Sequence, residues 1–91
     1  MRPCSKEMPK PKPPLTARQV FARNLRRVRR LKDMTQEGLA LEAEVPRAYV
    51  SRVERGAINI SIDNAEVLAK AVGVPLRDLV DPDKFPDIDD A

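Results

Sequence analysis

The sequence of 91 residues contains no histidine, no tryptophan and a single cysteine, Cys4. One cysteine cannot form a disulfide within the chain, and a metal site built from cysteine and histidine has no ligands to use. A glycine-rich phosphate loop is missing too, because the chain has only three glycines and they are far apart. None of the common catalytic arrangements can be assembled from what remains. We therefore expect a protein that is not an enzyme and that holds no metal and no cofactor.

Long apolar runs are also absent. No stretch approaches the roughly 18 consecutive apolar residues that span a bilayer, and the N-terminus has no apolar segment typical of a signal peptide. We expect a soluble, cytoplasmic protein. Its length allows one small domain with tails, which we place as an arm at 1–14, a domain at 15–80 and a tail at 81–91. This leaves no room for a separate effector-binding domain.

The formal net charge is only +3, but it is unevenly distributed. Residues 1–14 carry a net +3, residues 15–80 have twelve basic and eight acidic side chains, a net +4, and residues 81–91 carry a net −4. An acidic tail therefore masks a basic domain in the total. A basic domain favours a polyanion as its partner.

The two tails have different compositions. Residues 1–14 contain five of the nine prolines, interleaved with lysines, which predicts a disordered arm. We expect a solubilising tail; the alternatives are a ligand of SH3-type domains and a basic arm that follows a DNA backbone. The C-terminal tail is expected to fold on a partner or to compete with DNA for the basic face. Its acidic residues are Asp81, Asp83, Asp87, Asp89 and Asp90.

Helical periodicity begins at Thr16, and no segment of 15–80 shows the alternation of a strand. Capping residues and breakers divide the domain into five helices. They are expected from Thr16, with Thr16 or Leu15 at the cap, to near Asp33, from Thr35 to about Glu44, over 46–55, from Ser61 to Gly73 and over 76–80. The expected inward residues are Phe21, Leu25, Val28, Leu31, Leu39, Ala40, Ala43, Val50, Val53, Ala65, Leu68, Ala69 and Val72. The fold class is all-α.

The first helix is unusually basic on its expected outer face. Acidic residues are almost absent there until Asp33, and six positive charges without balancing partners favour a polyanion nearby. These residues are Arg18, Arg23, Arg26, Arg27, Arg30 and Lys32.

The segments 35–40 (TQEGLA) and 45–56 (VPRAYVSRVERG) resemble the helix-turn-helix of lambda-repressor-like regulators, the group of Cro-type repressors and xenobiotic-response-element proteins. Segments 25–29 (LRRVR) and 68–76 (LAKAVGVPL) extend the resemblance over about residues 18–80. It implies a five-helix DNA-binding domain that places helix 46–55 in the major groove of double-stranded DNA. The function expected is that of a transcriptional regulator, acting as a repressor.

Helix 46–55 supplies the expected base contacts. If Val50 and Val53 point inward, then Arg47, Ala48, Ser51 and Arg52 face outward. An arginine fork can bind guanine O6 and N7, and the methyl group of an alanine suits a thymine methyl. Tyr49 is expected to contact a base or a phosphate, with shielding of the helix flank as the alternative.

The resemblance also implies roles for residues outside this face. It assigns phosphate contacts to Gln36, Arg55 and Asn59, and Thr35 is expected to approach the same backbone. It makes Arg29 and Glu54 a partly buried ion pair that ties the first helix to helix 46–55. Two positions depart from the family pattern. Glu44 stands where a left-handed glycine is usual, and Pro46 stands where a capping Ser or Thr is usual.

Regulators of this kind gain specificity by pairing two copies on a near-palindromic operator, with half-sites about one helical turn apart. We expect a homodimer. Its interface is expected at Leu76, Val80, Phe85 and Ile88. A restriction-modification controller protein and a phage-type repressor would look alike at this length. The alternative function is a protein-interaction module, such as an antitoxin or a bridging coactivator.

Overall fold

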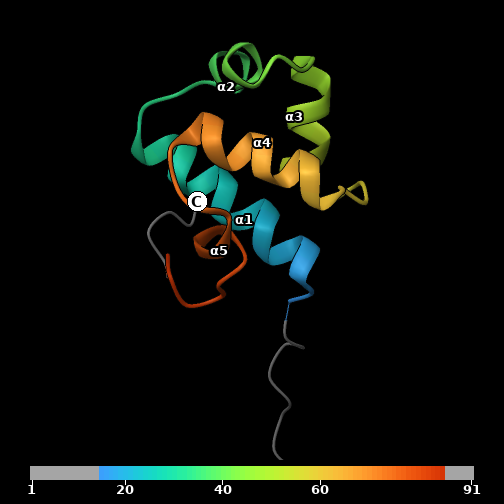
Figure 1. Ribbon diagram of the computed structural model, residues 1–91, viewed down its shortest axis with the longest axis vertical. Coiled ribbons are helices and arrows are strands. Elements are labelled where there is room, and N and C mark those ends of the chain that lie inside the picture. The colour runs from blue at the N-terminus through green and yellow to red at the C-terminus, as the bar shows by residue number, and fades with distance from the viewer. Residues whose placement is uncertain (1–14, 86–91) are drawn as a thin grey trace, which may run out of the picture.

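A computed structural model describes residues 15–85, which form five helices and no strand. This confirms the predicted all-α class. Figure 1 shows α2 and α3 at one end of the molecule, α1 and α4 crossing its middle and α5 at the other end. The helices are α1 (Ala17–Leu31), α2 (Gln36–Ala43), α3 (Arg47–Glu54), α4 (Ile62–Val72) and α5 (Leu76–Leu79).

Three of the five helices, α1, α2 and α4, begin where a side-chain cap satisfies one of their first N–H groups. Thr16 and Gln19 form a reciprocal capping box at the start of α1, and the hydroxyls of Thr35 and Ser61 accept hydrogen bonds from Gly38 N and Asn64 N. Pro46 is the residue before α3 and makes no side-chain cap. The predicted helix 46–55 is therefore one residue shorter at each end.

The core lies where α1, α2, α3 and α4 meet, and all the predicted inward residues of α2, α3 and α4 are buried. Leu31 was predicted to be inward, but this is wrong, because its side chain is 57% exposed. At 100° per residue it lies about 80° away from the stripe formed by Phe21, Leu25 and Val28. It is also the last residue of α1.

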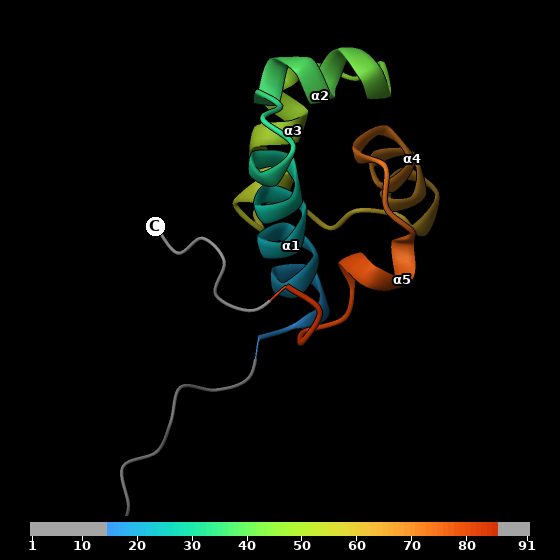
Figure 2. The ribbon, with the colours of Figure 1, turned by 90° about the vertical axis from the view of Figure 1, so that its left-hand side faces the viewer.

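The segment after α5 packs along α1 through three polar side chains of that helix. Asn24 is fully buried and donates to Leu79 O (3.1 Å) and Asp81 O (2.9 Å). Arg23 donates to Pro82 O at 2.8 Å, and Arg27 donates to Phe85 O. We call residues 81–85 the strap. Figure 2 shows the strap running from α5 to the lower half of α1.

The predicted outward basic face of α1 is therefore partly wrong. Arg27 is buried and Arg23 is half-buried, because both donate hydrogen bonds to backbone carbonyls of the strap. Arg18, Arg30 and Lys32 are exposed as predicted, and Arg26 is half-buried. Part of the positive charge thus satisfies backbone carbonyls of the same chain.

Over residues 15–85 no helix is both long and apolar enough to span a membrane. Within the same range, no three acidic or cysteine side chains are grouped to hold a metal ion.

Candidate nucleic-acid interface

The outward face of α3 carries most of the residues that were predicted to contact bases. Arg47, Ala48 and Arg52 are exposed and Ser51 is half-buried, whereas Val50 and Val53 are buried in the core. Because positions 47, 48, 51 and 52 fall within one arc of a helix, α3 presents them together. The two arginines thus project from one exposed surface.

Tyr49 lies at the edge of this arc and is half-buried, with its ring packed against the core. Part of its surface is therefore already used within the domain. This packing favours the alternative in which the tyrosine shields the flank of α3. A base or phosphate contact from its hydroxyl stays a prediction.

The position of α3 depends on the ion pair between Arg29 of α1 and Glu54 of α3. The guanidinium binds the carboxylate through two hydrogen bonds, Nε to Oε2 at 2.6 Å and Nη2 to Oε1 at 3.0 Å. The side chains are only 10% and 3% exposed, and Arg29 Nη1 also donates to Met34 O at 2.8 Å. A bidentate pair shielded from water fixes both the distance and the orientation of the two helices.

Gln36, the first residue of α2, joins this pair to the exposed face. Its Nε2 donates to Glu54 Oε1 at 3.1 Å, and its Oε1 accepts from Arg47 Nη1 at 3.4 Å. A chain of hydrogen bonds therefore runs from the buried Arg29 through Glu54 and Gln36 to the exposed Arg47. It connects α1, α2 and α3 and restrains an arginine that faces solvent.

The other predicted phosphate ligands lie at helix ends, Thr35 and Arg55, or on a loop, Asn59. The Thr35 hydroxyl caps α2, so Thr35 lies beside the first free N–H groups of that helix. Arg55 directly follows α3, is exposed and donates to Ser51 Oγ at 2.5 Å. Asn59 is exposed on the connection between α3 and α4. Anions are favoured at the N-termini of helices, which makes the start of α2 the most suitable of these places.

The turn between α2 and α3 contains both departures from the usual pattern. Glu44 adopts the left-handed conformation, with φ 60° and ψ 45°, and no side chain caps α3 at Pro46. A left-handed conformation costs an ordinary residue about 1–2 kcal/mol relative to the right-handed one. Glu44 therefore adopts the left-handed conformation that a glycine usually adopts at this position, although a residue with a side chain is less favourable there.

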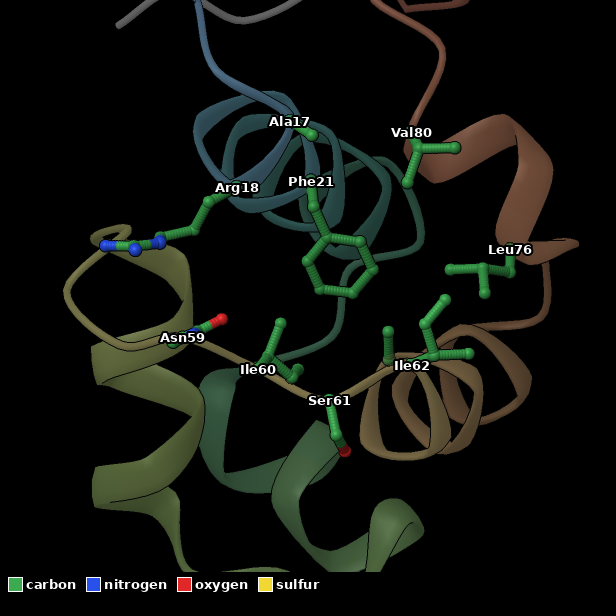
Figure 3. A pocket seen from close by; sticks show the side chains of 10 residues that line it. Ala17, Arg18, Phe21, Asn59, Ile60, Ser61, Ile62, Leu76 and Val80 are labelled. Atoms are coloured by element: carbon green, nitrogen blue, oxygen red, sulfur yellow. The ribbon is translucent and has the colours of Figure 1, made fainter.

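An apolar groove of about 250 Å³ lies between α1, α4 and α5. Figure 3 shows Phe21 pointing into it, with Ile60, Ile62, Leu76 and Val80 around its ring. Ile62 is 72% exposed and Val80 is 45% exposed. Figure 3 also shows Arg18 and Asn59 together at one end. Two of the predicted interface residues, Leu76 and Val80, are therefore brought together.

The other two predicted interface residues are placed differently. Phe85 is half-buried against the core in the strap, with its carbonyl held by Arg27, so part of its apolar surface is already covered. Ile88 lies outside the described residues. Ile62 was not singled out from the sequence, because an apolar residue directly after a cap looks like an ordinary first-turn position.

Asn24 is a second residue that was not singled out from the sequence. Its position three residues after Phe21 and four before Val28 places it on the apolar stripe of α1. A buried polar side chain needs hydrogen-bond partners, and Asn24 finds them in the carbonyls at the end of α5. A polar residue within an apolar stripe was the signal that could have revealed it.

Comparison with known proteins agrees with this geometry. Residues 25–79 match the helix-turn-helix family. The control protein C.BamHI of Bacillus amyloliquefaciens is 45% identical over 65 residues, which cover 70% of this chain and 80% of that protein. The restriction-modification controller protein C.AhdI of Aeromonas hydrophila is 39% identical, with a TM-score of 0.65 over 68% of this chain and 94% of that one.

A third similar protein is the controller protein C.Esp1396I, solved as a tetramer in complex with its natural 35 base-pair operator. It is 26% identical, with a TM-score of 0.65 over 74% of this chain and 97% of that one. The family match covers more than half of the chain, and C.BamHI is matched over most of its own length. The chain therefore belongs to the helix-turn-helix family of transcriptional regulators.

Proposed function

We propose that the chain regulates transcription by placing the exposed face of α3 in the major groove of an operator. The observation that carries this proposal is the chain of hydrogen bonds from the buried Arg29–Glu54 pair through Gln36 to Arg47. It restrains an exposed arginine at the N-terminal end of α3, which is the end that faces the bases in this docking mode. Arg47 and Arg52 bind guanines through their planar forks, and Ala48 contacts a thymine methyl.

Phosphate contacts from α2 and from the end of α3 orient the domain on the duplex. The start of α2 presents free N–H groups beside Thr35 and Gln36, where a phosphate oxygen is favoured by the helix dipole. Arg55 and Asn59 bind the other backbone strand. Contacts of this kind set the register but carry no sequence information.

The active form is a homodimer on a near-palindromic operator. The exposed Ile62 and Val80 border the apolar groove, and a second copy would cover both side chains. Its rim includes Asn59, so the same face lies next to a proposed phosphate ligand. Pairing at this groove would therefore bring the two α3–α4 connections of the dimer, each with its Asn59, close to each other.

Among helix-turn-helix regulators, we assign the chain to the controller type associated with restriction-modification systems. The support is the similarity to C.BamHI and C.AhdI, which is highest among the relatives described above. Such a regulator acts in the cytoplasm and has no catalytic role. Repression is the expected outcome, and a fusion of the bound promoter to a reporter gene tests it.

Selection of bound duplexes from a random pool tests the proposal. A near-palindromic consensus with two half-sites is expected. Affinity for random duplex should also fall with salt, with a log–log slope of about −0.9 for each phosphate contact. A protein-interaction module would select no consensus and show little affinity for random duplex, and this result would overturn the proposal.

A further inference from the structure

A second basic surface lies between α1 and the C-terminal end of α3. It is a groove of about 240 Å³, and we call it the arginine groove. Three arginines line it together with two apolar side chains. These residues are Leu15, Ala22, Arg23, Arg26 and Arg55.

The positive charge of the arginine groove is not balanced within the described part of the chain. Its acidic lining residue is Glu54, whose carboxylate is already bound by Arg29 through two hydrogen bonds. The ion pairs found among residues 15–85 involve none of the three groove arginines. A surface that carries several positive charges attracts anions. An anion is therefore the ligand that this groove favours.

Arg26 differs from the other two arginines of the groove. Its side chain is half-buried, and its Nε is shielded from water without an acceptor among residues 15–85. By contrast, Arg23 donates to Pro82 O and Arg55 donates to Ser51 Oγ. Buried donors are normally paired, and charges are screened less where water is excluded. We therefore expect Arg26 to attract an anion more strongly than an exposed arginine does.

The arginine groove adjoins the DNA-binding surface proposed above. Arg55 directly follows α3 and lines the groove, and it is also a proposed phosphate ligand. Arg26 comes three residues before Arg29, so the two lie on the same side of α1. Arg29 binds Glu54, the last residue of α3. A DNA strand held by Arg55 would therefore pass close to Arg26.

We propose that Arg26 is a further phosphate ligand, so that the arginine groove holds the DNA backbone next to the phosphate bound by Arg55. The guanidinium of Arg26 binds a phosphate oxygen, and the exposed Leu15 packs on deoxyribose carbons. The footprint thus extends from the helix-turn-helix onto α1. Phosphate contacts carry no sequence information, so Arg26 raises affinity without changing the consensus. This inference rests on the proposed function and assigns it one more residue.

The anion site is tested first on the full chain without DNA. The Nε–H signals of the arginine side chains are recorded by NMR while sodium phosphate is added, and again with sodium chloride at the same ionic strength. We expect phosphate, and not chloride, to shift the signals of Arg26 and Arg55. The signal of Arg77, exposed on α5, should shift with neither salt. No shift at Arg26, or an equal shift with chloride, would overturn the proposal.

Affinity for duplex DNA tests whether the phosphate belongs to the backbone. Arg26→Gln should weaken binding to operator and random duplex alike by about tenfold, the loss of one hydrogen bond to a charged group, and should lower the salt slope by about one. Arg26→Lys keeps the charge and should retain the slope. Arg77→Gln is the matched control, because it removes the same charge at the end of the molecule opposite α2 and α3 (Figure 1). An equal loss in Arg26→Gln and Arg77→Gln would mean that only net charge acts, and the proposal would be wrong.

Neutral methylphosphonates at single positions of the operator locate the contact. A position that weakens binding of the parent but not of Arg26→Gln marks the phosphate held by Arg26. It should neighbour the position marked in the same way by Arg55→Gln. If every position weakens Arg26→Gln as much as the parent, Arg26 binds no backbone phosphate and the proposal is wrong. Failure of the parent itself to bind duplex would instead contradict the proposed function.

Discussion

Gln36 and Arg29 share one carboxylate: the amide of Gln36 donates to Glu54 Oε1 at 3.1 Å, and Arg29 donates to the same oxygen at 3.0 Å. The first residue of α2 and the last residue of α3 are thereby fixed to each other and to α1. A shift of any of the three helices would lengthen at least one of these bonds. The orientation of the DNA-binding helix thus depends on a buried group that touches no DNA.

We expect Arg29→Met to lower the free energy of unfolding by about 3–5 kcal/mol, because it leaves a buried carboxylate without its counter-ion. Urea denaturation measures the change. Arg77→Met serves as the control, since Arg77 is exposed and its ion pair is long, at 4.0 Å. Adding Glu54→Leu to Arg29→Met should recover part of the loss. A loss no larger than that of the control would contradict a structural role for the pair.

Glu44→Gly is expected to raise the free energy of unfolding by up to about 1 kcal/mol, since glycine adopts the left-handed conformation without a steric penalty. Glu42→Gly is the matched control, because Glu42 is exposed within α2 and glycine there should cost about 1 kcal/mol. Thermal or urea unfolding of the two variants should give changes of opposite sign. Destabilisation by both would show that Glu44 makes a compensating contact.

Arg47→Ala and Arg52→Ala should each remove the preference for particular base pairs, a loss of about 1–3 kcal/mol against the cognate sequence. Arg55→Ala should instead weaken binding to all sequences and lower the salt slope by about one. Selection from a random pool followed by anisotropy titrations distinguishes the two classes. If Arg47→Ala weakens all sequences equally, Arg47 is a phosphate ligand.

Ile62→Asp should convert the homodimer to a monomer, because it places a charge at the rim of the apolar groove. Sedimentation equilibrium at tens of micromolar measures the change. Leu41→Asp is the control, since Leu41 is 76% exposed on α2, away from the groove. Both variants should keep the helical circular dichroism of the parent. A monomeric parent, or dimers of Ile62→Asp, would contradict the proposed interface.

Local signals were enough to predict most of the fold. The caps at Thr16, Thr35 and Ser61 act on N–H groups three residues away, so they can be found in a short stretch of sequence. The ion pair of Arg29 and Glu54 spans 25 residues and followed from the family resemblance. Its hydrogen bond to Gln36 emerged only from the structure.

The incorrect predictions for Arg23 and Arg27 concern contacts between distant segments, whereas the one for Leu31 has a local cause at the end of α1. Arg27 appeared to face solvent because nothing near it in sequence suggests that Phe85 O lies above it. The family match ends at residue 79, so it contains no information on the strap. Whether an arginine binds DNA or a carbonyl of its own chain depends on such packing, which composition and periodicity do not determine.

The contact of Asn24 with the end of α5 also constrains the order in which the protein acquires its structure. The three carbonyls that accept from this buried amide come 54, 55 and 57 residues later in the chain. A nascent chain that has not yet emerged from the ribosome beyond residue 81 would bury the Asn24 amide without these partners. The domain therefore completes its fold only after residue 81 has left the ribosome, and a chain that terminates within α4 or α5 should be degraded by proteases.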